Sequence, residues 1–517
     1  MVKKAYLILA AALLLLRTAS AQTLERVSPE SQGVSSEAIL NFLDGIAESK
    51  NEFHSFVFLR HGKVIAEGWW NPYRKELKHT LYSTSKSFTS TAVGFAVSEG
   101  KLKLDDKVVS FFPDQLPDTV SPLLAKLTVQ HLLMMSTGQK EEPSIDENSG
   151  KTWVQQFFAD PISDEPGTVF RYNSIATYML SAIVQKVTGQ KIVDYLQPRL
   201  FSPLKITGAD WEESPQKIST GGWGLRLKTE DLARFGQMML QKGKWQGKTV
   251  VPANWVNEAT TFKIKNAADT AVRAKANSDW AQGYCYQFWR CRHNAFRADG
   301  AFGQYILVMP DQDAVIAINS ETGNMQDELN LVWKHLLPAM KEGALPANTS
   351  AQQNLQGRLA SLAIKMPEKT TVAGPEKALS GKNFRVDAND YGITRIAFAF
   401  APAACTFSLH IGDKLYAFKA GRNERVTGST DFPFSPPSLT ASRFGRPAGS
   451  GAQKTAGSFR WTDSNTLEIA MRYPESAHSE TFICHFEGEK ATVKKATSLQ
   501  VMTQPGAPLP QITATRE

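Results

Sequence analysis

Hydrophobic and polar positions along the first two thirds of the chain predict a mixed fold. Two apolar runs around a turn at 56–66 favour a hairpin, and further strand patterns cover 303–309 and 314–319. Apolar residues recur with helical period in five other segments, 83–100, 128–135, 174–187, 229–241 and 325–340. Strands at both ends with helices between them indicate one α/β (α+β) unit, whose sheet is completed by distant parts of the chain.

The pattern changes after residue 341. A stretch rich in Gly, Ala, Asn and Ser, with one weak helical segment, predicts a connector at 346–376. Short apolar runs between polar turns then predict strands at 393–400, 406–411, 414–419, 457–461, 466–472 and 480–486. We therefore expect a first folded domain over 22–345 and a separate all-β domain over 377–517.

Residues 1–21 have the pattern of a secretory signal peptide. Lys3 and Lys4 precede an apolar run, and Ala19-Ser20-Ala21 provides the small residues of a cleavage site. The apolar run is too short to span a bilayer comfortably, which disfavours the alternative of an uncleaved anchor. We predict an exported protein, periplasmic or secreted, with no integral membrane segment after removal of the signal.

Composition and charge exclude several classes of protein. The chain is 42% hydrophobic and 10% aromatic, so it can bury a sizeable core. Its formal charge is +8, and without the three basic residues of the signal segment it is +5, with no dense basic cluster. This argues against nucleic acid as a partner. The sequence does not decide the oligomeric state.

The four cysteines are too few for a disulfide scaffold, although export permits bridges. Cys405 and Cys484 lie in separate predicted strands, and a bond between them is left open. Cys285 and Cys291 are either bridged or buried thiols.

Ser83 and Lys86 form the strongest candidate for chemistry. Residues three apart on a helix share one face, so Lys86 lies beside the Ser83 hydroxyl and can activate it. A helix start also offers unpaired N–H groups to a developing negative charge. A second Ser-x-x-Lys string, Ser214 to Lys217, lies in a polar stretch that we interpret as a loop.

Two further sequence elements indicate catalysis only in combination with Ser83 and Lys86. Tyr172-Asn173-Ser174 follows a Pro-Gly-Thr turn and opens a helix, where a tyrosine can relay protons. The segment 297–304 carries Gly300 and Gly303 before a strand, so a substrate backbone can approach closely there.

In this order the motifs resemble the serine β-lactamase and penicillin-binding-protein superfamily, in particular its β-lactamase-related esterases, amidases and D-peptidases. The similarity covers roughly 33–341 and includes further segments at 62–63, 127–133, 136–138, 166–168 and 229–235. It implies an antiparallel sheet flanked by helices, with a helical subdomain and the site between them. It also implies a Ser83 acyl-enzyme, proton transfers shared by Lys86 and Tyr172, and an oxyanion held by the backbone N–H groups of Ser83 and Ala301.

The chain departs from this family at two substrate-contacting positions. Ala298-Asp299-Gly300 stands where relatives that receive a substrate carboxylate often carry Lys-Thr-Gly or His-Thr-Gly. Ser174 replaces an asparagine that is frequent in relatives. We expect Ser174, Asp299 and Gly300 to contact a small-molecule or peptide substrate, and a negative Asp299 to disfavour an anionic substrate end if its side chain faces the cleft.

The sequence therefore predicts an exported serine hydrolase that cleaves an ester or amide bond through an acyl-enzyme. A true β-lactamase or DD-peptidase is the first alternative, and a catalytically idle cell-wall-binding protein is the second. The nine histidines form neither an H-E-x-x-H motif nor a Cys/His cluster, so neither a metal nor a cofactor is predicted.

Overall fold

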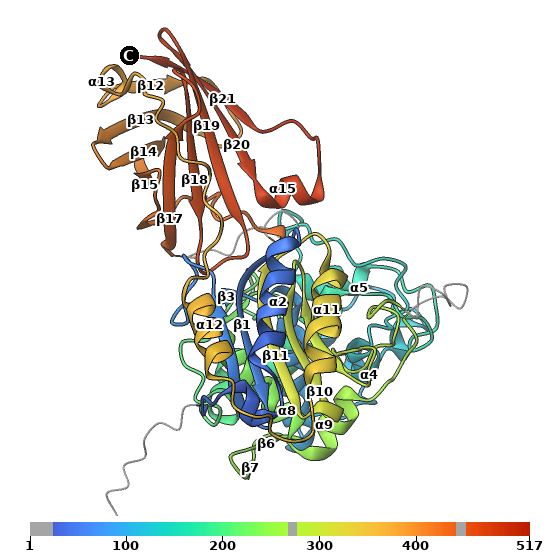
Figure 1. The fold of residues 1–517 in the computed structure, drawn as a ribbon. Helices are drawn as coiled ribbons and strands as arrows, with labels where there is room; N and C mark the ends of the chain where they lie inside the picture. Colours follow the sequence, from blue (N-terminus) through green and yellow to red (C-terminus); the bar gives the residue numbers. More distant parts are fainter. Residues whose placement is uncertain (1–23, 267–276, 441–450) are drawn as a thin grey trace, which may run out of the picture.

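The computed structural model describes residues 24–266, 277–440 and 451–517 of the chain (Figure 1). The predicted signal peptide lies outside the described residues. Within these ranges, no helix combines the length and apolar character needed to cross a membrane. An N-terminal α/β domain and a C-terminal β domain are visible, and both predicted fold classes are confirmed.

A six-stranded antiparallel sheet is the frame of the N-terminal domain, in the order β2-β1-β11-β10-β9-β8. The predicted hairpin supplies its first two strands, and β1 then pairs with β11 from some 260 residues later. The sheet is thus completed by distant segments, as expected. The strands are β1 (Glu52–Arg60), β2 (Lys63–Trp69), β8 (Trp289–Arg290), β9 (Phe296–Gly300), β10 (Gln304–Met309) and β11 (Ala314–Glu321).

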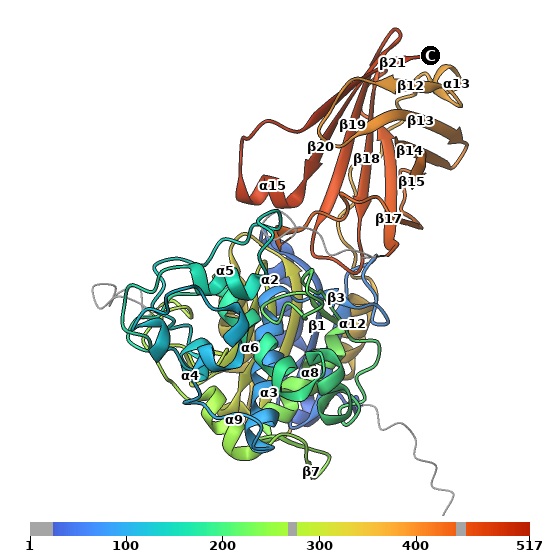
Figure 2. The same cartoon turned by 180° about the vertical axis from the view of Figure 1, so that it is seen from behind.

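Helices cover both faces of this sheet. Figure 1 shows α2, α11 and α12 on one face, and Figure 2 shows α8 with α3 and α6 on the other. Alternate residues of β11 point to the two layers, because Ile316 belongs to the core under α2 and Ala317 to the core under α8. The helices of this domain are α2 (Ser36–Glu48), α3 (Ser85–Ser98), α4 (Val129–Leu133), α5 (Trp153–Ala159), α6 (Ser174–Thr188), α7 (Ile192–Leu196), α8 (Thr229–Leu240), α9 (Ala253–Thr260), α11 (Met325–Leu331) and α12 (Thr349–Ala360). Short strand pairs join β3 (His79–Thr80), β4 (Asp210–Trp211) and β5 (Leu225–Leu227), and β6 (Lys244–Trp245) with β7 (Lys248–Thr249).

The segment predicted as a connector begins as part of the N-terminal domain. Leu355 of α12 and Leu362 after it are buried in the same core as α2. The backbone then bonds to Asn71, since Asn71 N donates to Leu362 O at 3.0 Å and Ile364 N donates to Asn71 O at 2.9 Å. Few apolar residues in α12 contact the core, which explains the weak helical pattern.

Ten strands form the C-terminal β domain, in the order β15-β14-β13-β12-β21-β20-β19-β18-β17-β16. A parallel pairing of β15 with β17 brings the two sides together, so the sheet curls around a core of aromatic side chains. The elements are α13 (Glu376–Leu379), β12 (Asn383–Val386), β13 (Ile393–Ala401), β14 (Ala404–Ile411), β15 (Lys414–Arg422), β16 (Val426–Thr430), β17 (Gln453–Trp461), β18 (Thr466–Arg472), β19 (Ser479–Glu487), β20 (Lys490–Thr497), α15 (Ser498–Thr503) and β21 (Gln511–Arg516).

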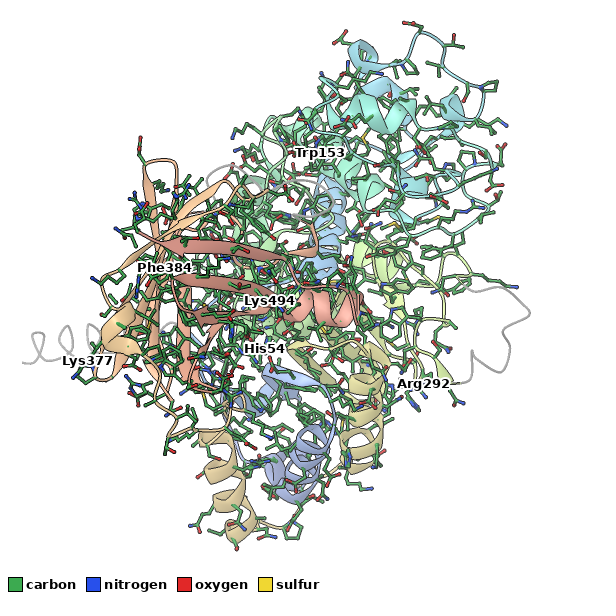
Figure 3. All side chains as sticks on the ribbon, turned by 90° about the horizontal axis from the view of Figure 1, so that it is seen from above. His54, Trp153, Arg292, Lys377, Phe384 and Lys494 are labelled. Carbon is green, nitrogen blue, oxygen red and sulfur yellow. The ribbon has the colours of Figure 1, made fainter. Side chains whose placement is uncertain are left out.

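Charged and polar side chains form part of the contact between the two domains. Arg472 of β18 forms a two-pronged ion pair with Glu52 of β1, and one prong measures 2.9 Å. The following turn bonds to the first domain, because Thr80 N donates to Glu475 O at 3.2 Å. Seen from above, Figure 3 places the labelled His54 beside strands of the C-terminal domain. The second domain therefore contacts the end of the sheet next to β1.

Candidate active site

Ser83 lies in a 3₁₀ turn, Tyr82–Thr84, immediately before α3. Its side chain is half-buried. The turn is anchored below the serine, since Ser85 Oγ donates to Tyr82 O at 2.6 Å and accepts from Leu225 N at 3.1 Å. Ser83 thus precedes the first α-helical residue by two positions, close to the predicted place at the helix start.

Lys86 is buried and extends to three oxygens around the predicted nucleophile. Its Nζ donates to Ser83 Oγ at 3.1 Å, to Ser174 Oγ at 3.1 Å and to the Gly222 carbonyl at 2.7 Å. The helical spacing of Ser83 and Lys86 therefore produces the expected contact. The Ser174 hydroxyl also contacts Lys86, which adds a role to its predicted contact with substrate.

Tyr172 completes the group around Ser83. Its ring lies 4.9 Å from Lys86 Nζ and stacks on Trp289, with 5.7 Å between the ring centres. Burial raises the pKa of the Tyr172 phenol, and its interaction with Ser83 opposes that rise only in part. The Tyr172 phenol is therefore protonated at neutral pH in the enzyme without substrate, and it can donate a hydrogen bond.

The start of α6 positions Tyr172 and Ser174. Asn173 caps this helix, because its side chain accepts from Ala176 N at 2.9 Å. The Ser174 N–H donates to the Glu142 carboxylate at 2.5 Å. Glu142 thus brings a carboxylate to the edge of the site from a loop with no regular pattern.

The third predicted element is strand β9 and the turn after it. A side chain at Gly300 would place its Cβ 2.2 Å from Leu81 O and 2.9 Å from Thr84 Oγ1. Thr84 Oγ1 also donates to Gln304 O at 2.9 Å. Gly300 is therefore required for close approach of β9 to the nucleophile turn, whereas the sequence suggested an approach of the substrate. Ala301 follows Gly300 directly and packs against the buried cluster that contains Tyr82, the residue before Ser83.

Asp299 lies in this strand but is paired within the protein. Arg297 Nε donates to its carboxylate at 2.8 Å, and neither side chain has more than 9% of its surface exposed. Arg297 also lies over Trp280 at 4.2 Å and near Trp289 at 5.5 Å. Burial raises the pKa of the Asp299 carboxyl, and Arg297 opposes this rise. The charge expected to meet the substrate is thus largely neutralised by the neighbouring arginine.

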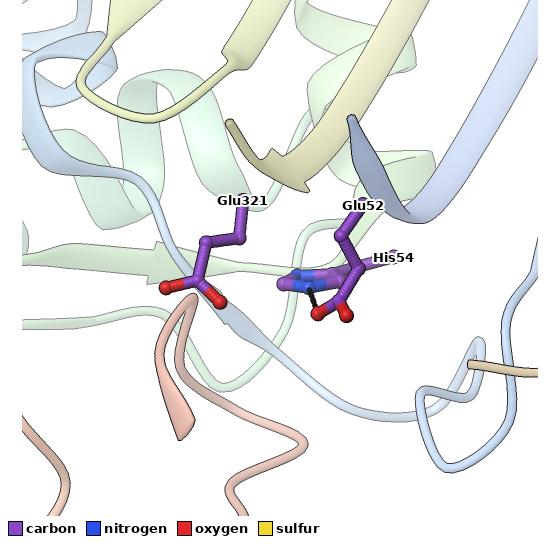
Figure 4. Close-up of side chains that lie close together, drawn as sticks. All are labelled: Glu52, His54 and Glu321. Atoms are coloured by element: carbon purple, nitrogen blue, oxygen red, sulfur yellow. Dashed lines mark hydrogen bonds and ion pairs between the residues drawn. The ribbon is translucent and has the colours of Figure 1, made fainter. Parts of the chain in front are cut away.

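Another cluster has the composition of a metal site. Figure 4 shows Glu52, His54 and Glu321 at the ends of β1 and β11, with ligand atoms within 4.8 Å of one another. Protein groups already bind these atoms. Glu52 pairs with Arg472, and Glu321 accepts from His478 at 2.5 Å. We therefore assign the cluster to the contact between domains.

All four cysteines are buried free thiols. The structure thus contains neither of the bridges left open by the sequence. Burial raises the pKa of Cys285 and of Cys405 to about 12, and that of Cys291 to about 11.

A model of the Beta-lactamase family matches residues 54–337, more than half of the 517-residue chain. The chain belongs to the β-lactamase family. It is 26% identical over 327 residues to the 6-aminohexanoate-dimer hydrolase of Paenarthrobacter ureafaciens, covering 58% of this chain and 81% of that protein. Lovastatin esterase of Penicillium rubens is 29% identical over 163 residues, covering 26% of this chain and 41% of the esterase. A solved penicillin-binding protein homologue from Pyrococcus abyssi is 15% identical with a TM-score of 0.46, covering 92% of this chain and 99% of that one.

The family match and the hydrolase relatives confirm the predicted class of protein, a β-lactamase-related serine hydrolase acting on ester or amide bonds. Sequence reasoning missed three members of the site. Gly222 supplies a carbonyl to Lys86, Trp289 supports Tyr172, and Glu142 binds the start of α6. Only Gly222 had a visible signal, because it lies in the glycine-rich segment 221–224.

Proposed function

We propose that this protein is an exported serine hydrolase that forms an acyl-enzyme at Ser83. The observation that carries the proposal is the contact of Lys86 Nζ with Ser83 Oγ at 3.1 Å, beside the partly buried phenol of Tyr172. A lysine in this position matches the need of a serine hydroxyl for a neighbouring base. The signal-like segment at 1–21 supports export.

The reaction follows from these positions. Ser83 Oγ attacks the carbonyl carbon while its proton passes to the neutral amine form of Lys86, because an ammonium cannot accept a proton and the Tyr172 phenol already carries one. The backbone N–H groups of Ser83 and Ala301 stabilise the oxyanion. When the carbon–heteroatom bond breaks, Lys86 and Tyr172 return the proton to the leaving alcohol or amine. Water then attacks the acyl-enzyme, releases the acid and restores the Ser83 hydroxyl.

A fluorophosphonate probe tests this proposal. We expect the wild-type protein to be labelled and Ser83→Ala to remain unlabelled. Ser214→Ala is a matched control that should still be labelled, because Ser214 belongs to the second Ser-x-x-Lys string and its hydroxyl lies 3.1 Å from the Tyr178 hydroxyl. Labelling that survives in Ser83→Ala contradicts an acyl-enzyme at Ser83. Labelling that is absent from the folded wild-type protein favours the idle binding protein.

The base is tested separately. Lys86→Ala and Tyr172→Phe are each expected to slow acylation at least about 10²-fold, the usual scale for loss of general-base catalysis. Stopped-flow measurement with a p-nitrophenyl ester reports the acylation step directly. Acylation near the wild-type rate in both variants refutes the proposed proton transfers.

We further propose that the substrate lacks a carboxylate at the position near β9. Arg297 is fully buried and bound to Asp299, so it offers no free cation to an anionic substrate end. Relatives named as a 6-aminohexanoate-dimer hydrolase and a lovastatin esterase support amide and ester substrates. We expect short esters, or amides with an uncharged or amino-bearing end, to be hydrolysed better than penicillins.

Comparison of kcat/KM for p-nitrophenyl esters, amino-acid amides, D-Ala-D-Ala peptides and nitrocefin tests this choice. Turnover of nitrocefin or D-Ala-D-Ala far above that of esters and amides overturns it. That result favours the alternative, a true β-lactamase or DD-peptidase.

A further inference from the structure

Both proposed oxyanion donors are next to residues with unusual backbone conformations. Tyr82, immediately before Ser83, has φ of 47°, and Phe302, immediately after Ala301, has φ of 66°. Bulky residues rarely adopt positive φ, and such conformations persist only where the surrounding structure holds them. The position of the two N–H groups thus depends on whatever fixes Tyr82 and Phe302.

His478 of the C-terminal domain contacts both residues. Its Nε2 is 2.7 Å from the Tyr82 hydroxyl, and its ring meets the Phe302 ring edge-to-face with 4.6 Å between centres. The Tyr82 and Phe302 rings also touch, with centres 5.5 Å apart. His478 is fully buried, so these contacts are not shared with bulk solvent. One side chain from the second domain therefore joins the two oxyanion segments.

The orientation of His478 is fixed from the opposite side of its ring. Nδ1 lies 2.5 Å from Glu321 Oε1, at the end of β11. A carboxylate accepts a hydrogen bond, so Nδ1 carries a proton, and in the neutral ring Nε2 then accepts from the Tyr82 hydroxyl. Figure 4 shows the Glu321 carboxylate beside a loop of the C-terminal domain. Glu321 also accepts from Ser498 Oγ at 2.5 Å, which ties the start of α15 to the same carboxylate.

Apolar side chains enclose this arrangement. Tyr82, Phe302 and Ala477 form one buried cluster, against which Ala301 and three residues of the C-terminal domain pack, namely Leu439, Leu499 and Met502. The cluster includes one proposed oxyanion residue and the neighbours of both. The C-terminal domain thus packs directly against the two segments that carry the proposed oxyanion donors.

We propose that His478 is a positioning residue that holds Tyr82 and Phe302, and through them the oxyanion donors, so that the C-terminal β domain completes the active site. The inference rests on the proposed function for the roles of Ser83 and Ala301. A displacement of reacting groups by about 1 Å lowers rates by as much as about 10²-fold. Loss of the contact therefore lowers kcat, while substrate affinity changes little.

His478→Ala is compared with His485→Ala, which removes an exposed histidine from β19, the strand that begins one residue after His478. With a p-nitrophenyl ester we expect His478→Ala to lower kcat at least about tenfold, with KM changed less than about twofold. His485→Ala should match the wild type. His478→Gln keeps a hydrogen-bonding side chain and should recover part of the rate. Full activity of a folded His478→Ala protein overturns the inference.

Tyr82→Phe removes only the hydroxyl and decides the question if His478→Ala does not fold. We expect it to lower kcat more than His478→Gln does, and the Tyr82→Phe/His478→Gln double variant to be no slower than the slower single variant. Wild-type kcat in Tyr82→Phe, or fully additive losses in the double variant, contradict a shared contact.

Hydrogen exchange separates this inference from the proposed function, because it needs no catalysis. His478→Ala should speed amide exchange in peptides covering 80–85 and 299–304, and His485→Ala should not. If Ser83→Ala still reacts with the fluorophosphonate, the proposed function is wrong, whereas the exchange data still report on His478. Unchanged exchange in both peptides overturns the positioning role.

Discussion

Arg297 and Asp299 form a buried ion pair close to Trp289, the residue whose ring stacks on Tyr172. Trp289 stacks on Tyr172 and lies near Arg297, so the ion pair and the phenol share one neighbour. Arg297 also donates to the Asp279 and Arg290 carbonyls and to the Cys291 sulfur. The pair thus joins β9 to the segment 279–291 and keeps Trp289 in place.

Arg297→Gln leaves the Asp299 carboxylate buried without its cation. We expect the free energy of unfolding at pH 7 to fall by about 3–5 kcal/mol, the usual effect of breaking a buried pair. Urea unfolding provides the measurement. Arg297→Gln/Asp299→Asn should recover much of the loss, because it removes the unpaired charge.

Arg358→Gln is the control, since Arg358 and Asp44 form an exposed pair at 3.8 Å. Its loss should change stability by less than about 1 kcal/mol. Equal effects of the buried and exposed replacements contradict the role given to burial.

At the scale of elements, the site depends on the contact between the nucleophile turn and β9. Gly300 permits it, and Thr84 Oγ1 donates at 2.9 Å to the carbonyl of Gln304, which is the residue of β10 paired with Gly300. The nearest atom to a Cβ at Gly300 is a backbone oxygen, which cannot rotate away as a side chain does. The strand must therefore move if the glycine is replaced.

Gly300→Ala should accordingly separate β9 from the Ser83 turn and lower kcat/KM for an ester by about 10²-fold, as expected for a shift of about 1 Å. Gly323→Ala is a suitable control, because a methyl group at Gly323 would have nothing within 4 Å. Steady-state kinetics on both variants checks the prediction. Similar activity in the two variants shows that the contact is not needed.

Periodicity predicted the elements whose apolar residues face one core. The predicted helix at 174–187 is α6, ending before Gly189, whose φ of 71° suits the cap. The contact of Ser83 with Lys86 was also predictable, because both residues belong to one helical turn. These are local consequences of sequence.

Other features depend on contacts that no local pattern encodes. The pairing of Arg297 with Asp299 follows from strand alternation and burial together, and the role of Gly300 follows from an oxygen of the turn at Leu81. Strand β12 has four residues and is recognisable only through its partners, β13 and β21. The contact of His478 with Tyr82 joins residues 396 positions apart.

On the scale of the whole molecule, the ion pair between Glu52 and Arg472 forms a charged junction between the two domains. Burial alone raises the pKa of Glu52, but contacts with His54 and Arg472 lower it from 4.5 to about 2. Burial also lowers the pKa of His54, against the effect of Glu52. The ionised carboxylate is therefore the form that stabilises the junction.

This shift predicts how stability changes with pH. A depressed carboxyl pKa stabilises the fold above pH 4.5, and the contribution is lost as pH falls towards 2, amounting to at most about 3 kcal/mol. Glu52→Gln should lower the thermal midpoint at pH 7, and its difference from the wild type should shrink below pH 4.5. Thermal unfolding at intervals from pH 7 to 2 measures this. A difference that stays constant over that range contradicts the assignment.

Strand β21 lies between β12 and β20, so residues 511–516 pair with a strand that begins near residue 383. Such a separation makes closure of the β domain a late event in folding, because a long loop must be ordered first. Since the same domain carries His478, catalytic competence should appear after the hydrolase core has folded. In a refolding experiment, we expect fluorophosphonate labelling of Ser83 to lag behind the burial of tryptophans in the N-terminal domain. The enzyme would then become active only once its second domain has folded.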